Sequence, residues 1–403
     1  MPACAGPLQI DSPVKTLSSV AALLFSVFLL IAGNSLVGVL TPLRASLDGF
    51  PDLTIGLLGS VYFSGMLGGT LATPAIVRRA GHIRAFAAFV AIGVVSIVMM
   101  PGWDAPAPWM AFRGALGFVF AGIYAVVESW INAKASNGNR GALYGVYQIV
   151  TFVASAGGQL FLRSFSLTSF LPFAVGGSLL ALAIVPLTMT SVDPPVQPKS
   201  VRLRLPWLIG LAPVSALAAL VAGAANGAVF ALGAVYALQI GIKPSAVPLF
   251  TAAIVAGSAF GVYPAGFLSD RMDRRLVMAV AMAAGAAAEF TLAALRLSGT
   301  PLVAMGFLVG ATTYTIYTLA TSHANDRAKA HEMVVVSSGL LFIYCIGAIV
   351  APALASLLMR VFGPSALFAQ SGVAHTAVVI FAIWHFVADS AARRVANPRT
   401  PIP

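Results

Sequence analysis

Long apolar runs constrain the fold of this chain more than any other feature of its sequence. A helix needs about 20 apolar residues to cross the roughly 30 Å of hydrocarbon in a bilayer. Runs of that length can be placed twelve times along the chain. The expected spans are 17–41, 54–77, 83–101, 107–132, 141–162 and 168–190, then 209–237, 245–269, 275–296, 301–322, 334–359 and 366–388. The sequence therefore predicts an all-α polytopic membrane protein with twelve transmembrane helices.

The composition excludes several other classes of protein. Of 403 residues, 59% are hydrophobic and 9% are charged, which is unlike a soluble domain. The net charge of +11 comes from basic residues scattered over short loops, so it indicates membrane topology and not nucleic-acid binding. Cys4 and Cys345 are too few and too far apart for a disulfide framework or a metal site. No ATP-binding Gly-x-x-x-x-Gly-Lys-Ser/Thr loop occurs, which disfavours an ATP-driven pump.

Basic residues also predict the orientation. If both termini are cytoplasmic, seventeen of the 23 Lys and Arg residues lie on the inner side and five on the outer side, while Arg113 lies within a span. This asymmetry predicts an inner-membrane protein with cytoplasmic termini. The first apolar run has only Lys15 before it and no cleavage site after it, so we expect it to be retained. The segment 191–206, rich in Pro and basic residues, is expected to link a first half at 1–190 to a second half at 207–403. All five tryptophans fall near predicted span ends, where interfacial anchors are expected, at positions 103, 109, 130, 207 and 384.

A charged decapeptide stands between two apolar runs of the second half. It reads Gly266-Phe-Leu-Ser-Asp-Arg-Met-Asp-Arg-Arg275 and resembles the signature of the loop between helices 2 and 3 in the major facilitator superfamily. The physics of such a loop suits a cytoplasmic hinge. Asp270 can accept hydrogen bonds from a neighbouring helix N-terminus, and Arg271 and Arg274 are expected at the inner membrane face.

A degraded copy of this segment lies one repeat earlier. Residues 74–84 contain Arg78 and Arg79, and Arg78 stands where Asp270 stands, 192 positions later. The same offset aligns Gly65 with Gly257, Gly69 with Gly261 and Asn34 with Asn226, and an offset of 193 aligns Gly117 with Gly310, Tyr124 with Tyr317, Ser129 with Ser322 and Asn132 with Asn325. Such matches indicate an internal duplication. They fit the parallel-repeat layout of the superfamily, in which two pseudo-symmetric six-helix bundles form the protein.

Arg113 and Glu128 lie in the fourth predicted span. Arg113 resembles the family's Arg-x-x-x-Gly element, which is often tied to proton-coupled members. Because a guanidinium at membrane depth is costly, we expect it to point into a cavity, the alternative being the outer interface roughly 9 Å away at about 1.5 Å per residue. Glu128, with Arg140-Gly141, resembles an element of sugar porters, which implies an inner gate in which Glu128 meets Arg78, Arg79 or Arg140. A solvated helix-end acid and a proton site are the alternatives.

Glu289 is the only acid placed deep in a predicted span. An isolated carboxylate there is expected to be protonated or paired. It is therefore a candidate proton site, with structural burial as the alternative. His375 and His385 have no second ligand at metal spacing, so we expect no metal and no other cofactor.

Asn34 and Asn226 occupy equivalent places in spans 1 and 7, which line the cavity in this fold. Further hydrogen-bonding side chains expected near that cavity are Tyr62, Tyr124, Gln148, Thr151, Thr313, Tyr314, Tyr317 and Tyr344. Such a lining suits a small solute that is amphipathic or modestly polar. Hydrogen bonding between helices is the alternative role for each of these residues.

The resemblance to the major facilitator superfamily thus implies a secondary transporter that moves a small-molecule solute across the lipid bilayer by alternating access, with protons as a candidate coupling ion, and we expect a monomer. A non-transporting sensor on the same fold is one alternative. A membrane-embedded enzyme is another, but clustered nucleophiles, acids or histidines are missing. The segments 128–132 and 322–327 are similar to the YcaD-like bacterial subgroup. The helix 5 element of exporters is only half kept, at Gly157-Gly158, so neither import nor export is predicted.

Overall fold

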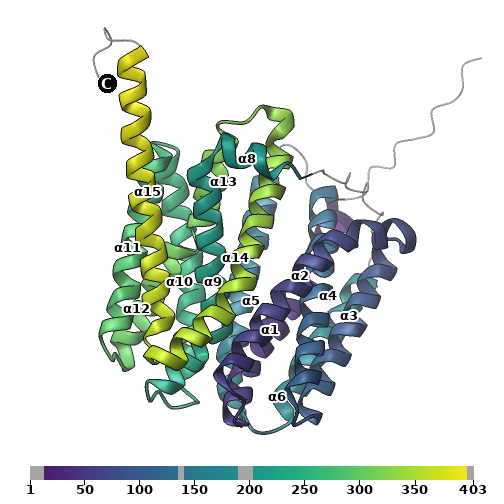
Figure 1. The fold of residues 1–403 in the computed structure, drawn as a ribbon. Coiled ribbons are helices and arrows are strands. Elements are labelled where there is room, and N and C mark those ends of the chain that lie inside the picture. Colours follow the sequence, from purple (N-terminus) through teal and green to yellow (C-terminus); the bar gives the residue numbers. More distant parts are fainter. Residues whose placement is uncertain (1–12, 135–139, 189–202, 397–403) are drawn as a thin grey trace, which may run out of the picture.

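A computed structural model describes residues 13–134, 140–188 and 203–396, and these form helices and their connections (Figure 1). The N-terminal half comprises α1 (Pro13–Leu47), α2 (Asp52–Ala80), α3 (His82–Met99), α4 (Pro106–Lys134), α5 (Arg140–Phe161), α6 (Leu171–Leu182) and the short α7 (Ile184–Thr188). The C-terminal half comprises α8 (Leu205–Leu211), α9 (Pro213–Gln239), α10 (Val247–Ser269), α11 (Arg274–Ala294), α12 (Gly299–Thr313), α13 (Ile316–Asn325), α14 (Met333–Phe362) and α15 (Ala366–Ala396). Most of the expected linker at 191–206 lies outside the described residues.

The described helices account for the twelve predicted spans. The sixth span is shorter than predicted, and the tenth is divided into two helices. Eleven are long and apolar enough to cross a membrane, and a shorter apolar helix at Leu171–Pro186 corresponds to the sixth span. The residues at the start of that expected span form a loop instead, since Pro172 falls in the first turn of α6 and favours a helix start there. The tenth span is divided into α12 and α13 at Tyr314 and Thr315. The predicted all-α membrane fold is confirmed.

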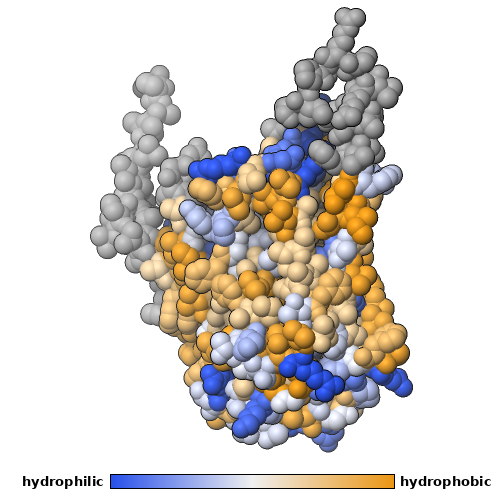
Figure 2. Space-filling view, turned by 90° about the vertical axis from the view of Figure 1, so that its left-hand side faces the viewer, coloured by the Kyte–Doolittle hydropathy of each residue, from blue (hydrophilic) through white to orange (hydrophobic). Residues whose placement is uncertain are grey.

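The two halves stand side by side in Figure 1, the first on the right and the second on the left. One end of the molecule holds α8 and the end of α7, and we call it the linker end. We call the opposite end the far end. In Figure 2, hydrophobic residues cover most of the middle of the visible face, and hydrophilic residues gather toward its two ends. This is the distribution expected of a surface that meets lipid between two aqueous sides.

Glycines at repeated positions hold neighbouring helices together in both halves. A Cβ at Gly65 or Gly69 of α2 would collide with the backbone of α4, and a Cβ at Gly117 of α4 would collide with α2. The repeat partners do the same between α10 and α12, at Gly257, Gly261 and Gly310. We call these contacts the glycine seams. Small residues let helix backbones approach closely in a membrane, which gives the internal repeat a packing role.

The tryptophans only partly match the expectation for interfacial anchors. Trp103 and Trp384 are 52% and 63% exposed, but Trp109 and Trp130 are buried. Trp109 donates a hydrogen bond to the Trp103 carbonyl oxygen at 2.9 Å, and Trp130 packs edge-on against Phe86. The expectation fails for these two because a position near a span end can still face the bundle. Sequence position alone does not distinguish that face from the lipid face.

Candidate transport pathway

Contacts between the two halves gather toward the far end. A Cβ at Gly56 of α2 would collide with Ser356 and the Pro352 carbonyl of α14, and one at Gly59 would collide with Ala231 of α9. The Gln239 side-chain amide donates to the Asp52 carboxylate at 3.0 Å, where α9 ends and α2 begins. These contacts close the molecule between its halves at the far end.

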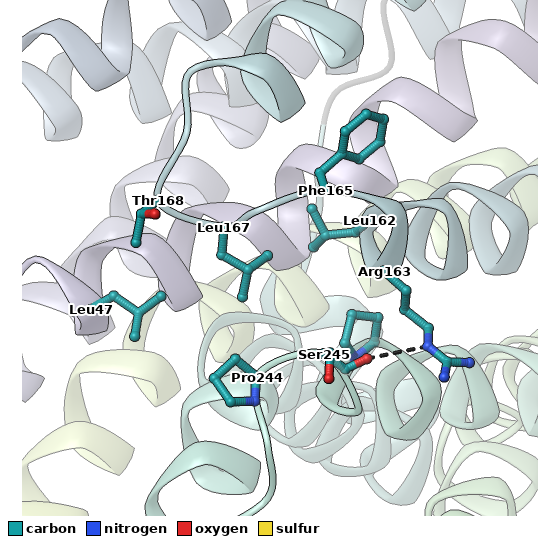
Figure 3. A pocket seen from close by; sticks show the side chains of 9 residues that line it. Leu47, Leu162, Arg163, Phe165, Leu167, Thr168, Pro244 and Ser245 are labelled. Carbon is teal, nitrogen blue, oxygen red and sulfur yellow. Dashed lines mark hydrogen bonds between the residues drawn. The ribbon is translucent and has the colours of Figure 1, made fainter.

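A recess of ≈ 300 Å³ lies at the same end, between loops of the two halves (Figure 3). The first half contributes Leu47 and the segment from Leu162 to Thr168, and the second half contributes Pro244, Ser245 and Pro248. Arg163 Nε donates across it to the Ser245 carbonyl oxygen at 3.2 Å, as the dashed line in Figure 3 shows. Most residues that line the recess are apolar, and its one charged side chain, Arg163, is already bound to a backbone oxygen, so we assign the recess to closure and not to solute binding.

The equivalent asparagines each contact a tyrosine cluster of their own half. Asn34 interacts with the hydroxyl groups of Tyr62 and Tyr124. Asn226 Nδ2 donates to the Tyr344 hydroxyl at 3.3 Å, and Asn226 Oδ1 is buried without a partner. The Tyr344 ring meets the Tyr317 ring edge-on at 5.1 Å. The structure therefore brings six of the expected polar residues into two related groups.

A small cavity of ≈ 50 Å³ lies between the halves near these groups. Its lining includes the predicted Tyr314 together with Ser35, Gln159 and Phe230, which the sequence analysis missed. Gln159 Oε1 is buried without a partner, and Ser35 shares a 2.8 Å hydrogen bond with Ser155. Phe230 follows Asn226 by four residues and so lies on the same face of α9, a spacing that could have indicated it.

Arg113 is buried, with 2% of its surface exposed. Its guanidinium carbon lies 4.4 Å from the centroid of the Tyr62 ring and 5.9 Å from that of Phe230, which belongs to the other half. Among the residues that the structure describes, no carboxylate lies within 4 Å of the guanidinium, and Nε has no hydrogen-bond acceptor. The side chain thus points to the junction between the halves.

The residues expected at the inner gate of the first half lie apart in this conformation. Glu128, Arg78 and Arg79 are exposed, and within the described ranges none of them has a salt-bridge partner. The side chain of Arg140 lies outside the described part of the structure. Gln148, expected at the cavity, is exposed on α5. Between α2 and α3, Gly81 has a φ of +81°, which lets the chain turn at the site of the degraded repeat.

The corresponding loop of the second half is tied to the end of α13. Arg274 Nε lies 2.8 Å from the Asp326 carboxylate, and Arg274 Nη2 donates to Asp270 at 3.3 Å. Asp273 caps α11 by accepting from the Arg275 backbone N–H at 2.8 Å. Asp270 therefore contacts an arginine one turn away, and Arg271 stacks on Phe267 with 3.5 Å between guanidinium carbon and ring centroid. We call the contacts among Asp270, Arg274 and Asp326 the second-half latch.

His323 adds a second tie between the same elements. Arg275 Nε donates to His323 Nε2 at 3.2 Å, and Nδ1 of the ring lies 2.8 Å from the Ser215 hydroxyl oxygen on α9. Because the arginine N–H needs an acceptor, Nε2 carries no proton in this arrangement. The ring is therefore neutral, and it joins the start of α11 to α9.

Glu289 and His375 form a fully buried pair between α11 and α15. Glu289 Oε2 lies 2.8 Å from His375 Nδ1, and both side chains are 0% exposed. Glu289 Oε1 and His375 Nε2 have no hydrogen-bond partner. In Figure 1, α11 and α15 lie on the side of the second half that faces away from the first. The pair is thus separated from the junction of the halves.

Comparisons with known proteins agree with this architecture. Residues 214–403 match the family model of the Major Facilitator Superfamily. An uncharacterized MFS-type transporter YcaD of Escherichia coli O139:H28 (strain E24377A / ETEC) is 28% identical over 357 residues, which cover 87% of this chain and 91% of the relative. The crystal structure of the nucleoside transporter NupG aligns with a TM-score of 0.78 at 12% identity, covering 92% of this chain and 99% of that one. A bacterial homologue of the human lysosomal transporter Spinster, inward-facing and unoccupied, aligns with a TM-score of 0.74 at 16% identity, covering 93% and 96%.

Eleven described helices long and apolar enough to cross a membrane, with a shorter twelfth, define an integral, multi-pass membrane protein, and the NupG alignment supports the transporter fold. Residues 214–403 match the Major Facilitator Superfamily model, and over most of its length the chain is similar to MFS-type transporters such as YcaD. The resemblance expected from the charged decapeptide and the repeat is confirmed.

Proposed function

We propose that the protein is a secondary active transporter that moves a small solute across the inner membrane by alternating access. The observation that carries this proposal is the uneven closure of the two halves. The far end is closed by contacts such as Gly59 with Ala231 and Asp52 with Gln239, whereas Glu128 and Gln148, nearer the linker end, are exposed. Such a difference is what one of two alternating states requires.

The proposed orientation places the linker end in the cytoplasm. The described basic residues near the linker end are Arg78, Arg79, Arg84, Lys134, Arg204, Arg271, Arg274, Arg275, Arg327 and Lys329, against Arg44, Arg163, Lys243, Arg296 and Arg360 near the far end. The positive-inside rule then makes the far end external. With this orientation the proposal assigns the structure to an inward-open state, the class of state in which the Spinster homologue is described.

The proposed solute site is the junction that contains both asparagine–tyrosine groups. Asn34 and Asn226 present amides from opposite halves, and Tyr314 lies where α12 gives way to α13. Broken helices free backbone groups near transporter binding sites. A solute with a few hydrogen-bonding groups on an apolar body fits this lining. Nucleosides, the solutes named for NupG, are one set to test.

Proton coupling is proposed with two candidate sites. Glu289 can carry a proton within its buried pair, because Oε1 and His375 Nε2 are both left unsatisfied. Glu128 lies exposed toward the linker end and can exchange protons with water there. At the same time Glu128 is the proposed gate acid, which would pair with Arg78, Arg79 or Arg140 once the linker end closes.

A flux measurement with an internal control tests the proposal. The protein is reconstituted into liposomes with Cys4 and Cys345 replaced by Ser and with cysteines at positions 52 and 239, whose side chains touch at the far end. Liposomes are then incubated with an isotope-labelled metabolite mixture, with and without a pH gradient, and the retained solutes are identified by mass spectrometry. We expect one solute class to accumulate with the reduced protein, with accumulation driven by the pH gradient.

Cross-linking positions 52 and 239 should abolish this flux, and reduction should restore it. Flux that is unchanged by the cross-link would contradict alternating access through the far end. A folded, reduced protein that moves no solute would instead favour a sensor on this fold.

A further inference from the structure

A buried arginine without a counter-ion lies at the junction of the halves. Arg113 is 2% exposed, and within the described ranges no carboxylate lies within 4 Å of its guanidinium. A guanidinium stays charged in proteins, so burial does not neutralise it. The Tyr62 and Phe230 rings offer their faces to the cation, but Nε still lacks an acceptor. The site thus holds a positive charge and an unused hydrogen-bond donor.

The cover over this charge comes from the opposite half. Phe230 of α9 lies 5.5 Å from the Tyr62 ring and 5.6 Å from the Phe63 ring of α2, between ring centroids. On its other side Phe230 approaches Gly38 of α1, where a Cβ would come within 3.3 Å of its ring. Because Phe230 belongs to the second half and its neighbours to the first, separation of the halves at the far end withdraws it. The guanidinium then faces the opened pathway.

The groups around the uncovered arginine define the chemistry of an occupant. The planar guanidinium favours a carboxylate or a phosphate group, to two oxygens of which it donates two parallel hydrogen bonds. Tyr62 and Phe63 provide apolar ring faces beside it. The amide oxygen of Gln159 is unpaired in the adjoining cavity, which Phe230 also lines, and it can accept from a hydroxyl or amide of the occupant. A bare inorganic anion would leave the aromatic walls unused.

We propose that the transported solute is an organic anion whose carboxylate or phosphate group binds Arg113 in the far-end-open state, in the place that Phe230 takes in the closed state. This inference rests on the proposed function, since it names the solute class of the same pathway. Phe230 and the anion compete for one face of the guanidinium. When the empty carrier closes, Phe230 covers the guanidinium. The cation–π contact then partly offsets the cost of burying the charge without a counter-ion.

Binding to the purified protein in nanodiscs tests the inference separately from transport. The probes are benzoate and phenyl phosphate, with benzyl alcohol and benzylamine as the neutral and cationic counterparts, and the acidic, neutral and basic fractions of a metabolite extract. Thermal unfolding is recorded for each. We expect the anions or the acidic fraction to raise the midpoint of the wild type by several degrees and the other probes to leave it unchanged.

Variants assign the effect to the site. Arg113→Gln should weaken anion binding at least tenfold, and Arg113→Lys should weaken it less because it keeps the charge without the planar fork. Phe230→Ala should tighten binding several-fold by removing the competing ring. Arg296→Gln, a change to an exposed arginine near the far end, should bind as the wild type does.

Three outcomes would overturn the inference: stabilisation by the neutral or basic probes alone, equal anion binding by Arg113→Gln, or no response of the wild type and of Phe230→Ala to any anion. Phe230→Ala tests anion binding at this site even if Arg113→Gln fails to fold. Flux of a neutral solute that ignores Arg113 would leave the transporter proposal standing and remove this one. Anion binding that needs Arg113, in a protein that moves no solute, would leave an anion site at Arg113 but remove the transporter proposal.

Discussion

At the scale of single residues, the Glu289–His375 pair is the least expected feature of the protein. Two ionisable side chains with no exposed surface lie 2.8 Å apart inside the second half. The sequence indicated that Glu289 would be protonated or paired, but it offered no link to a histidine 86 positions later. Removing one member of a buried ion pair is far more costly than replacing both, because it strands the other.

We therefore predict that Glu289→Leu and His375→Leu each lower the free energy of unfolding by about 3–5 kcal/mol. The double change should cost clearly less than the sum of the two, since neither partner is then stranded. Thermal unfolding in detergent gives the comparison, with Asp104→Asn at an exposed loop position as the control. If the effects of the two single changes simply add in the double variant, Glu289 and His375 do not stabilise each other in the folded protein.

A further variant, Glu289→Gln, decides between the two roles expected for Glu289. A structural pair should leave the pH-gradient dependence of transport intact in Glu289→Gln, whereas a proton site should lose it. Flux measured at several external pH values, scaled to the amount of folded protein, distinguishes these results.

How much of the site could be predicted depends on how rare each residue type is in a span. Arg113, Asn34 and Asn226 stand out because polar groups are costly in a bilayer, and the repeat relates the two asparagines. Phe230 could not be singled out from the sequence, because a phenylalanine in an apolar helix can face lipid as readily as it can pack against a cation. Gln159 was missed because its role depends on a neighbour from the other half. Contacts between halves are a property of the assembled molecule and leave no local pattern.

At the scale of helices and loops, the two halves differ in how they fix the loop at the linker end. The second-half latch joins Arg274 to Asp270 and Asp326, at 3.3 Å and 2.8 Å. In the first half Arg78 replaces the aspartate of the repeat, and it is exposed without an acidic partner in the described residues. The first-half loop is thus left without an equivalent tie in this conformation.

This difference leads to a prediction about Glu128. If Glu128 clamps Arg78, Arg79 or Arg140 when the linker end closes, a charge-assisted contact worth about 1.5–3 kcal/mol is lost in Glu128→Gln. The population should then shift toward the linker-end-open state about tenfold or more. Labelling of a cysteine placed at Gln148, in a variant without native cysteines, reports that shift.

The matched control is Glu332→Gln, which changes an acid at the linker end whose carboxylate accepts a hydrogen bond from the Lys329 backbone N–H. Unchanged labelling in Glu128→Gln, at normal expression, would show that Glu128 is a solvated helix end.

Helices were the most predictable elements, because the bilayer sets the length of an apolar run. The sixth span was overestimated, since hydropathy does not register that residues 165–170 connect two helices. The break between α12 and α13 was also missed, because neither Tyr314 nor Thr315 is a helix breaker by itself. The repeat indicated the glycine seams, but it does not reveal which neighbouring backbone each glycine meets.

At the scale of the whole molecule, the proposed orientation is open to direct measurement. Reporter fusions after Arg84, Arg204, Arg275 and Arg394 should all report cytoplasm, because the asymmetry of basic residues favours the linker end inside. Fusions in the loops after Leu47 and after Lys243, at the far end, serve as the opposite control and should report periplasm. An external signal from any of the first four would refute the twelve-span topology.

The far-end closure has a thermodynamic consequence for the transport cycle. Much of it is made by small groups, with Gly56 and Gly59 set against Ala231, Pro352 and Ser356. Separating such surfaces exposes little apolar area to water, and the heat capacity change of a transition scales with that area. These small groups should therefore contribute little to the heat capacity change of opening. Most of that change should come instead from the aromatic contacts of Phe230 with Tyr62 and Phe63, which separate when the far end opens.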